Sequence, residues 1–372
     1  MSIAPFRRRV EQLLEQADVA VDGNRPWDLQ VKHPRFFQRV LAQGSLGFGE
    51  SYMDGWWEAK SPDQLLTRLI SAKINSKVKS AVVAFDAFKA KLFNRQTTKR
   101  AFLVGEKHYD AGNDLYQKML DKRMIYSCAY WQDAETLDQA QEQKLDLICR
   151  KLDLKPGEKV LDIGCGWGGT AKFMAERYGV EVVGVTISSS QAELAREKCK
   201  NLPIEIRLQD YRKLKGEFDK IVSVGMFEHV GHKNYRTYFC KVSELLKDDG
   251  LFLLHTIGGN RPASRTDPWI ERYIFPNGVI PSSQQISKAF EGIFVLEDWH
   301  NFGPDYDRTL MVWQENFEHA WSELKANYDE RFRRMWLYYL SCSAASFRAR
   351  DNQVWQLVLS RYGIPGGRRF PR

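Results

Sequence analysis

The segment GMFEHVGHKNY places a carboxylate, Glu228, directly before a histidine, His229. Both residues follow the apolar run KIVSV, which has the composition of a buried strand. A carboxylate at the end of such a strand is suited to proton chemistry, because its ionised form is purely a hydrogen-bond acceptor. The open question is which proton is taken, and whether Glu228 is itself the base. We assign no role to His229.

A second candidate site is the glycine-rich turn LDIGCGWGGT. Glycines after a strand permit a tight turn and the close approach of a ligand to a helix N-terminus. Proteins that bind NAD, FAD or S-adenosylmethionine (SAM) all use such turns. Asp162 before the first glycine is typical of the Asp-x-Gly-x-Gly-x-Gly pattern of SAM methyltransferases, and the third-glycine spacing of a dinucleotide fingerprint is absent. The turn therefore favours SAM.

The next apolar run ends in VTIS, with Thr186 where nucleotide-binding folds usually carry an acid for the ribose hydroxyls. Either the ribose is held in another way or the chain belongs to a specialised subfamily.

These polar residues all lie at the ends of short apolar runs that alternate with amphipathic helical stretches such as TAKFMAERYG and SSQAELAREKCK. That alternation predicts an open parallel sheet with helices on both faces, which binds ligands at the carboxyl edge of its strands. The predicted strands are residues 159–164, 180–188, 204–210, 220–226 and 250–258. Before them, residues 1–72 contain helical stretches that the Gly- and Trp-rich piece GSLGFGESYMDGWWEAK interrupts.

The composition of the 372 residues is that of a globular protein, with 43% hydrophobic residues. No window reaches the roughly 18 continuous apolar residues of a spanning helix. The N-terminus MSIAPFRRRVEQLLEQ lacks the apolar core of a secretory signal. The six cysteines form no Cys-x-x-Cys pair, so we expect reduced thiols in a cytosolic protein.

The net charge of +8 is concentrated in one segment. Residues 1–105 carry +7, and Lys73 to Arg100 contains eight basic residues against one acid, Asp86. Apolar residues in that segment recur at three- and four-residue steps, which predicts a basic amphipathic helix. Such a helix can lie on an anionic membrane surface, pack against its own protein, or serve as a nucleic-acid footprint.

Over essentially its whole length the chain resembles the cyclopropane-fatty-acid-phospholipid synthases, in the mycolic acid cyclopropane synthase-like family of SAM methyltransferases. The resemblance implies a Rossmann-like class I SAM-methyltransferase sheet, mostly parallel with an antiparallel last strand, and a smaller helical N-terminal domain. We therefore expect a helical domain over 1–72, a basic helix or linker over 73–105, and a catalytic domain over 106–372. The matching motifs are GFGESYMDGWWE, GEKHYDAGNDLYQKML, MIYSCAYW, VLDIGCGWGG, GVTIS, GMFEHVG, LLHTIG, PWIERYIFPNG, EDWHNFGPDYDRTL and FRARDNQVWQ.

The resemblance implies methyl transfer from SAM to a cis double bond of a phospholipid acyl chain. The resulting carbocation loses a proton to a bound bicarbonate, and a cyclopropane ring closes. By residue-wise correspondence the bicarbonate contacts are the backbone N–H groups of Cys128 and Ile257, the side chains of His255 and Tyr306, and Glu228. Glu228 would accept the bicarbonate hydroxyl, so it would orient the base rather than be the base.

The same correspondence implies SAM contacts at Tyr126, Ser127, Gly164, Gly166, Gly168, Thr186, Ile187, Gln191, Gln209, Asp210 and Tyr211. Asp210 ends the third strand, where it would meet the adenine; the alternative is a plain surface aspartate. No metal is implied. A carbocation also favours aromatic faces nearby, and each candidate has core packing as its alternative role. These candidates are Tyr126, Tyr130, Trp131, Phe275 and Tyr306.

One position departs from the family pattern. Many relatives carry a cysteine in the C-terminal helix that has been proposed as catalytic, and it aligns with Ser343 in YYLSCSAASFRARD. The nearest thiol, Cys342, is one residue earlier, which turns a helical side chain by about 100°. We infer that the thiol is unnecessary, since bicarbonate chemistry needs no thiolate.

Several alternatives remain at this stage. A same-family enzyme could make methyl-branched or methylene-branched lipids or methylate a small amine. A nucleic-acid methyltransferase is disfavoured because no RNA-binding motif appears, and an inactive lipid-binding protein is disfavoured by the intact site residues. The N-terminal region with its basic helix favours lipid. We expect a homodimer that acts on unsaturated membrane phospholipids at the inner face of the cytoplasmic membrane and binds no nucleic acid.

Overall fold

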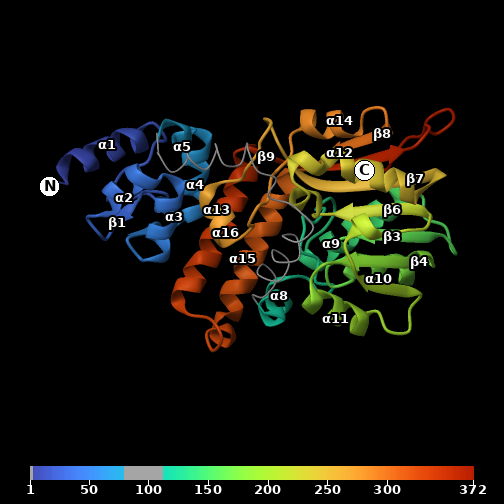
Figure 1. Cartoon of the computed structure of the whole chain (residues 1–372). Helices are drawn as coiled ribbons and strands as arrows, with labels where there is room; N and C mark the ends of the chain where they lie inside the picture. Colours follow the sequence, from blue (N-terminus) through green and yellow to red (C-terminus); the bar gives the residue numbers. More distant parts are fainter. Residues whose placement is uncertain (1–2, 79–111) are drawn as a thin grey trace. The chain divides into compact units, whose positions relative to one another are not determined.

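The computed structural model describes residues 3–78 and 112–372 (Figure 1). These residues form two compact units, each of which is described by itself. The first unit contains the N-terminal residues up to 78 together with residues 264–276 and 306–352. The second contains residues 112–263, 277–305 and 353–372. Each unit is therefore built from segments that are far apart in the sequence.

The second unit is built on a seven-stranded sheet with the order β5-β4-β3-β6-β7-β9-β8 (Figure 1). Neighbours from β5 to β7 pair in parallel, and β8 and β9 pair with each other in antiparallel fashion. The predicted mostly parallel sheet is thereby confirmed. The strands are β3 (Lys159–Ile163), β4 (Glu181–Thr186), β5 (Ile204–Leu208), β6 (Phe218–Val224), β7 (Leu246–Gly259), β8 (Val295–Asn301) and β9 (Asn352–Ser360).

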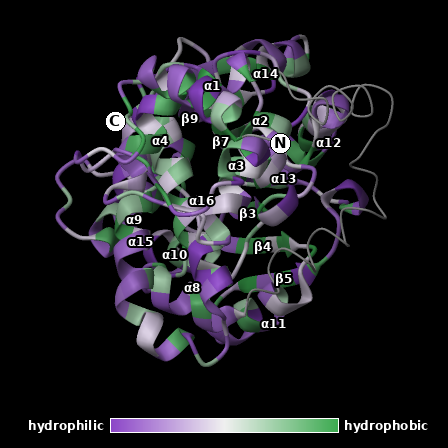
Figure 2. Ribbon diagram, turned by 90° about the vertical axis from the view of Figure 1, so that its left-hand side faces the viewer, coloured by the Kyte–Doolittle hydropathy of each residue, from purple (hydrophilic) through white to green (hydrophobic). Residues whose placement is uncertain are grey.

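Alternate residues of the strands bury into two separate hydrophobic clusters, one on each face of the sheet. In β7, Phe252 and Leu254 join one cluster while Leu251 and Leu253 join the other. This is the two-residue period of a strand that is buried on both sides. Helices α12 (Tyr235–Leu245) and α14 (Ser283–Phe290) cover the first face, and α9 (Leu137–Leu152) and α10 (Gly169–Tyr178) the second. Figure 2 shows the helices banded in hydrophilic and hydrophobic colours, as amphipathic helices should be.

Short elements complete the second unit at the ends of the strands. Helix α11 (Ser189–Lys198) follows β4, and α8 (Asn113–Met119) precedes the first strand. The 3₁₀ helices η1 (Tyr211–Lys213), η2 (Phe227–His229) and η3 (His232–Asn234) follow β5 and β6. The residues that were singled out after each apolar run therefore lie in strand-to-helix connections.

The first unit is mainly helical. It contains a two-stranded ribbon of β1 (Gln30–Val31) and β2 (Trp57–Glu58). Helix α16 packs on α3 and α4, so the C-terminal helix shares the core of the N-terminal residues. The helices are α1 (Ala4–Glu15), α2 (Phe36–Gln43), α3 (Ser45–Met53), α4 (Pro62–Ser71), α5 (Ile74–Lys77), α13 (Pro268–Tyr273), α16 (Glu330–Arg348) and most of α15 (Pro304–Leu324).

The Gly- and Trp-rich piece that the sequence analysis treated as an interruption contains helix α3, so that expectation is wrong. Its glycines serve close packing inside the helix. A Cβ on Gly47 would lie 2.6 Å from the carbonyl oxygen of Arg39, and one on Gly49 would lie 2.5 Å from the ring of Trp269. Packing against neighbouring elements outweighs the low helix propensity of glycine.

The predicted domain boundaries at residues 72 and 105 stay a prediction. The two compact units are defined by contacts, and each combines segments that are separated in the sequence. Most of the predicted basic helix, residues 79–105, lies outside the described residues. Among the helices that the structure describes, none combines the length and the apolar composition needed to cross a bilayer.

Candidate active site

A cavity of about 180 Å³ lies at the carboxyl edge of the sheet in the second unit. Its walls are the connections after β3, β4, β5 and β6 together with residues 124–127. The strand order reverses direction between β3 and β6, and in open α/β sheets ligands bind at such a switch point.

Ten of the eleven predicted SAM contacts line this one cavity. Gly168 is the exception: it caps α10 at φ +81°, where a Cβ would lie 2.9 Å from Cys199 Sγ. The cavity thus brings these ten residues together from four separate segments of the chain, and their contacts with SAM stay a prediction. The ten are Tyr126, Ser127, Gly164, Gly166, Thr186, Ile187, Gln191, Gln209, Asp210 and Tyr211.

The turn after β3 has the backbone that its glycines permit. Gly164 has φ +86° and Gly166 has φ +54°, in the left-handed region that side chains rarely adopt. A Cβ on Gly164 would also lie 2.8 Å from Cβ of Met226, another residue of the cavity wall. The glycines therefore keep this wall open for a ligand.

Asp162 presents an acceptor at the β3 end of the cavity. The residue is 1% exposed, and its Oδ2 has no hydrogen-bond partner among the described residues. Burial raises the pKa of Asp162 to about 7, and the ammonium of Lys144 opposes that shift. A buried acceptor without a partner fits a cationic ligand group such as the amino group of SAM.

At the β5 end, Asp210 is 2% exposed, so it is not the plain surface aspartate that was the alternative. Its carboxylate accepts from Arg212 Nε at 2.9 Å and from the Arg212 backbone N–H at 2.9 Å. Arg212 also lines the cavity. The pair holds the connection after β5 in place, so an adenine at this end would meet both side chains.

At the end of β4, Thr186 donates to Gln191 Oε1 at 2.9 Å and accepts from the backbone N–H of Ser188 at 3.2 Å. The amide of Gln191 thus stands beside the position where an acid was expected. Polar groups for ribose hydroxyls are therefore present at this strand end without a carboxylate on the strand.

A second polar cluster follows β6, where the side chain of Glu228 meets the backbone of Ile257 on β7. The Ile257 N–H donates to Glu228 Oε1 at 2.6 Å, so these two predicted bicarbonate contacts bind each other in this structure. Glu228 Oε2 is buried with no hydrogen-bond partner among the described residues. Burial raises the pKa of Glu228, and the Ile257 N–H opposes that shift. The cluster offers one unused buried acceptor, which fits the hydroxyl of a small acid anion.

His255 sits on β7, where its carbonyl accepts from the N–H of Gly225 in the cavity wall. The Gln356 amide nitrogen lies 3.3 Å from His255 Nδ1. An amide nitrogen only donates, so Nδ1 accepts and the ring proton is on Nε2. Burial, with the charges of Lys144 and Lys151, holds the pKa of His255 well below its usual value. His255 is therefore a neutral N–H donor at working pH.

Cys128 follows Ser127 directly and is fully buried, with its thiol donating to the Ala129 carbonyl at 3.1 Å. Tyr306 belongs to the first unit, where its ring packs 4.7 Å from that of Phe347 and 5.9 Å from that of Trp313. Cys128 thus directly follows a residue of the cavity wall, and the parts of Cys128 and Tyr306 in the site stay predictions.

The candidate aromatic residues also belong partly to the second unit and partly to the first. Tyr126 lines the cavity, and Tyr130 packs against His300 and Phe302. Phe275 lies in the first unit against Tyr339. Their role around a carbocation stays a prediction.

Sequence reasoning assigned no role to several residues of the cavity wall, among them His229, Arg212 and Trp167. His229 follows Glu228 in η2, and burial lowers its pKa to about 4, so the ring is neutral at working pH. The adjacency to a strand end was the available signal for both His229 and Arg212. Trp167 was visible inside the glycine-rich turn.

Cys342 lies on α16 in the first unit, where burial and the carboxylate of Asp267 raise the pKa of its thiol to about 12. The thiol is therefore protonated at working pH. This agrees with the inference that no thiolate chemistry takes place at this helix.

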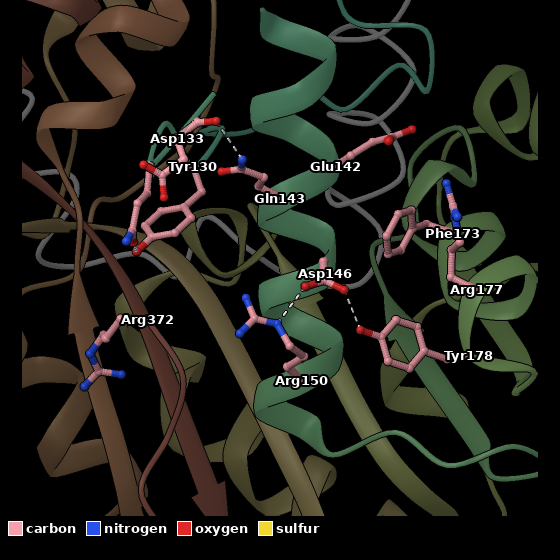
Figure 3. A pocket seen from close by; sticks show the side chains of 11 residues that line it. Tyr130, Asp133, Glu142, Gln143, Asp146, Arg150, Phe173, Arg177, Tyr178 and Arg372 are labelled. Carbon is pink, nitrogen blue, oxygen red and sulfur yellow. Dashed lines mark hydrogen bonds and ion pairs between the residues drawn. The ribbon is translucent and has the colours of Figure 1, made fainter. Parts of the chain in front are cut away.

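A more open hollow of about 570 Å³ lies on the outer side of α9 (Figure 3). Two of its charged groups bind each other, since Asp146 accepts from Arg150 at 2.6 Å, and Asp146 also accepts from the hydroxyl of Tyr178 at 2.6 Å (Figure 3). Gln143 donates to the carbonyl of Asp133 on the same side. The hollow thus lacks the unpaired buried acceptors that mark the cavity at the sheet edge.

The family model described as mycolic acid cyclopropane synthetase matches residues 96–357. The cyclopropane-fatty-acyl-phospholipid synthase of Escherichia coli K12 is 55% identical over 368 residues, which cover 98% of this chain and 96% of that protein. The tuberculostearic acid methyltransferase UfaA1 of Mycobacterium tuberculosis is 33% identical over 356 residues, covering 88% of this chain and 82% of the relative.

Among solved structures, mycolic acid cyclopropane synthase CmaA1 complexed with SAH and CTAB matches with a TM-score of 0.65 and 33% identity. The match covers 69% of this chain and 97% of that one. The predicted class I SAM-methyltransferase fold is confirmed by these neighbours together with the strand order.

Proposed function

The chain belongs to the mycolic acid cyclopropane synthetase family and is a SAM-dependent methyltransferase, and from this premise we propose that it cyclopropanates the cis double bonds of phospholipid acyl chains. The observation that carries the proposal is the 55% identity over 98% of the chain to a cyclopropane-fatty-acyl-phospholipid synthase. The proposal is also supported by the buried carboxylates of Asp162 and Glu228, because each has an oxygen that no described residue binds and that a ligand could occupy.

The proposed reaction begins with SAM in the cavity at the sheet edge. The alkene attacks the sulfonium methyl group, so a C–C bond forms, the S–CH₃ bond breaks and S-adenosylhomocysteine leaves. The resulting cation then loses a proton from the transferred methyl group, and the freed electron pair closes the three-membered ring. The methyl group thus becomes the ring methylene.

Bicarbonate bound beside Glu228 would supply the base for that proton. Glu228 Oε2 would accept the bicarbonate hydroxyl, which turns an unprotonated oxygen toward the cation. The neutral Nε2–H of His255 and the N–H of Cys128 would donate to the remaining oxygens. The Ile257 N–H would be shared with Glu228 Oε1, which it already binds at 2.6 Å. Tyr306 completes the proposed set.

The alternative within the family is a methyl-branched lipid, in which the cation loses a proton from a carbon of the acyl chain instead of from the transferred methyl group, so that the product keeps a double bond. The similarity to a relative named tuberculostearic acid methyltransferase favours this second candidate over methylation of an amine. The two lipid outcomes share the first step and differ in whether the transferred methyl group loses a proton.

The proposed setting is the inner face of the cytoplasmic membrane, with the enzyme bound peripherally as a homodimer. The basic segment from Lys73 to Arg100 supports contact with an anionic surface, since its eight basic residues face one acid. Its apolar residues recur at helical spacing, as in helices that lie in the membrane interface.

The proposal is tested by incubating the purified protein with SAM and vesicles of cis-unsaturated phospholipid, followed by mass analysis of the acyl methyl esters. We expect a gain of one CH₂ with loss of the alkene. Bicarbonate-depleted buffer should slow the reaction, and added bicarbonate should restore it. An unchanged lipid fraction together with a methylated amine in a parallel incubation would overturn the proposal.

A further inference from the structure

Helix α9 buries three polar side chains, of which Lys151 forms an ion pair with Asp298 at 3.2 Å. Its outer face presents Gln143, Asp146 and Arg150 to the open hollow (Figure 3). Its inner face contains Gln141 and Lys144, and both are 0% exposed. Burying a lysine and an amide is costly unless their polar groups are hydrogen-bonded or paired. The two residues are three apart, so they lie on one side of the helix.

Lys144 binds the cavity wall through one contact. Its Nζ donates to Ser127 Oγ at 2.8 Å, and among the described residues this oxygen is the sole hydrogen-bond acceptor for the ammonium. Because an ammonium only donates, the Ser127 oxygen accepts and its own hydrogen must point elsewhere. Ser127 lines the cavity, and its Cβ lies near the wall residue Gly225. The cavity is therefore the side on which the Ser127 hydroxyl can donate.

Gln141 binds the backbone of the same segment. Its Nε2 donates to the carbonyl of Ser127 at 2.9 Å and to that of Ile125 at 3.3 Å. The Ser127 carbonyl and the Cys128 N–H belong to one planar trans peptide, in which the two groups point in opposite directions. Holding the carbonyl toward α9 therefore aims the Cys128 N–H away from α9.

We propose that Gln141 and Lys144 are positioning residues that orient the donors of two adjoining subsites from one helix face. Lys144 directs the Ser127 hydroxyl to the carboxylate of the SAM methionine group, while Gln141 directs the Cys128 N–H to the bicarbonate. The Gln141 half rests on the proposed function, because it requires a bicarbonate site.

The charges around Lys144 agree with the assigned ligand. The carboxylate of Asp162, with its unpaired oxygen, lies within the electrostatic reach of Lys144. A methionine group carries both a carboxylate and an ammonium. A hydroxyl backed by an ammonium suits the first, and an unpaired buried carboxylate suits the second. The β3 end of the cavity thus offers a donor for the carboxylate and an acceptor for the ammonium of the methionine group.

The test separates the two roles by measuring SAM affinity and bicarbonate dependence in the same variants. Lys144→Met keeps the length of the side chain and removes its charge. We expect the Kd for SAM to rise about tenfold to a hundredfold, as for a lost charge-assisted hydrogen bond, with little change in half-saturating bicarbonate. Gln141→Met should raise half-saturating bicarbonate about three- to tenfold and leave the Kd for SAM within about twofold.

The matched controls are Gln143→Met and Arg150→Met on the outer face of the same helix, which should leave both parameters unchanged. The double variant Lys144→Met/Ser127→Ala should bind SAM no more weakly than either single variant, because Lys144 acts through Ser127. If Lys144→Met does not fold, Ser127→Ala alone must show the rise in Kd.

Equal shifts of both parameters in both variants, or fully additive losses in the double variant, would overturn the inference. A wild-type rate that is independent of bicarbonate would instead refute the proposed base, and with it the Gln141 half. The Lys144 half would then be decided by SAM binding alone, which requires no turnover.

Discussion

Replacing Glu228 by glutamine separates an orienting carboxylate from a catalytic base. The amide keeps the shape of the side chain, and its oxygen can still accept from the Ile257 N–H, which Glu228 Oε1 binds at 2.6 Å. What changes is the second oxygen, Oε2, which is buried with no partner among the described residues. Glutamine puts an NH₂ donor there, where the hydroxyl of bicarbonate needs an acceptor.

The expected loss follows from that one contact. A hydrogen bond to a charged group contributes about 1.5–3 kcal/mol, and each 1.36 kcal/mol is a factor of ten in rate. Glu228→Gln should therefore lower kcat about 10- to 150-fold at fixed bicarbonate. Higher bicarbonate should recover part of the loss, since the base itself is still available.

Although Glu228→Gln should lower kcat, it should not lower the stability of the folded protein. Burial raises the pKa of Glu228, so folding disfavours its charged form at neutral pH. A neutral amide carries no such cost, and the melting temperature of the variant should equal or exceed that of the wild type. The assay is the initial rate of acyl methylation in vesicles at a series of bicarbonate concentrations, with a thermal melt as the folding control. A loss beyond about a thousandfold that bicarbonate does not relieve would refute the reasoning and make Glu228 the base.

Three further predictions concern other parts of the molecule. Cys342→Ala should retain activity within about twofold, because a thiol with a pKa of about 12 carries no thiolate at working pH; a loss above tenfold in the vesicle assay would contradict this. Burial lowers the pKa of Lys144 to about 8, so the folded state releases its proton while the unfolded state still holds it. The free energy of unfolding of the wild type, relative to that of Lys144→Met, should therefore rise between about pH 8 and 10 by at most about 3 kcal/mol. Over the same range the SAM affinity of the wild type should fall relative to that of Lys144→Arg. The titratable groups that face this lysine are Asp121, Cys128 and Asp162, and a difference in unfolding free energy that does not change with pH in denaturant melts would count against the pKa shift. Reversing the charge of Lys73, Lys77, Lys79, Lys89 and Lys91 should abolish co-sedimentation with anionic vesicles, and unchanged co-sedimentation would show that the basic segment does not dock on lipid.

The sheet and the place of the cavity were predictable because both depend on local patterns. The run KVLDIG became β3, and the residues after four of the five predicted runs line one cavity because parallel strands end at one edge. The family motifs added residue positions, which composition and periodicity do not provide.

The features that the sequence did not predict depend on contacts between distant segments of the chain. In LDQAQEQKLDLICRKL, Gln141 and Lys144 have the residue types of a solvated face, and their burial follows from where α9 packs. The resemblance implied an antiparallel last strand, but the residue ranges of β8 and β9 were not predicted, and their pairing joins residues some sixty positions apart. Helix α16 joins the N-terminal residues for the same reason, since packing partners far along the chain leave no mark in a local window.

The central claim is that the transferred methyl group loses one hydrogen as the ring closes. The most direct measurement is the mass of the acyl product formed from SAM that carries a CD₃ group, with cis-unsaturated phospholipid vesicles as acceptor. Retention of two of the three deuterium atoms, with loss of the alkene, is the predicted result, because deprotonation removes the third. Retention of all three would mean that the methyl group stays intact, and would contradict cyclopropanation in favour of a methyl branch.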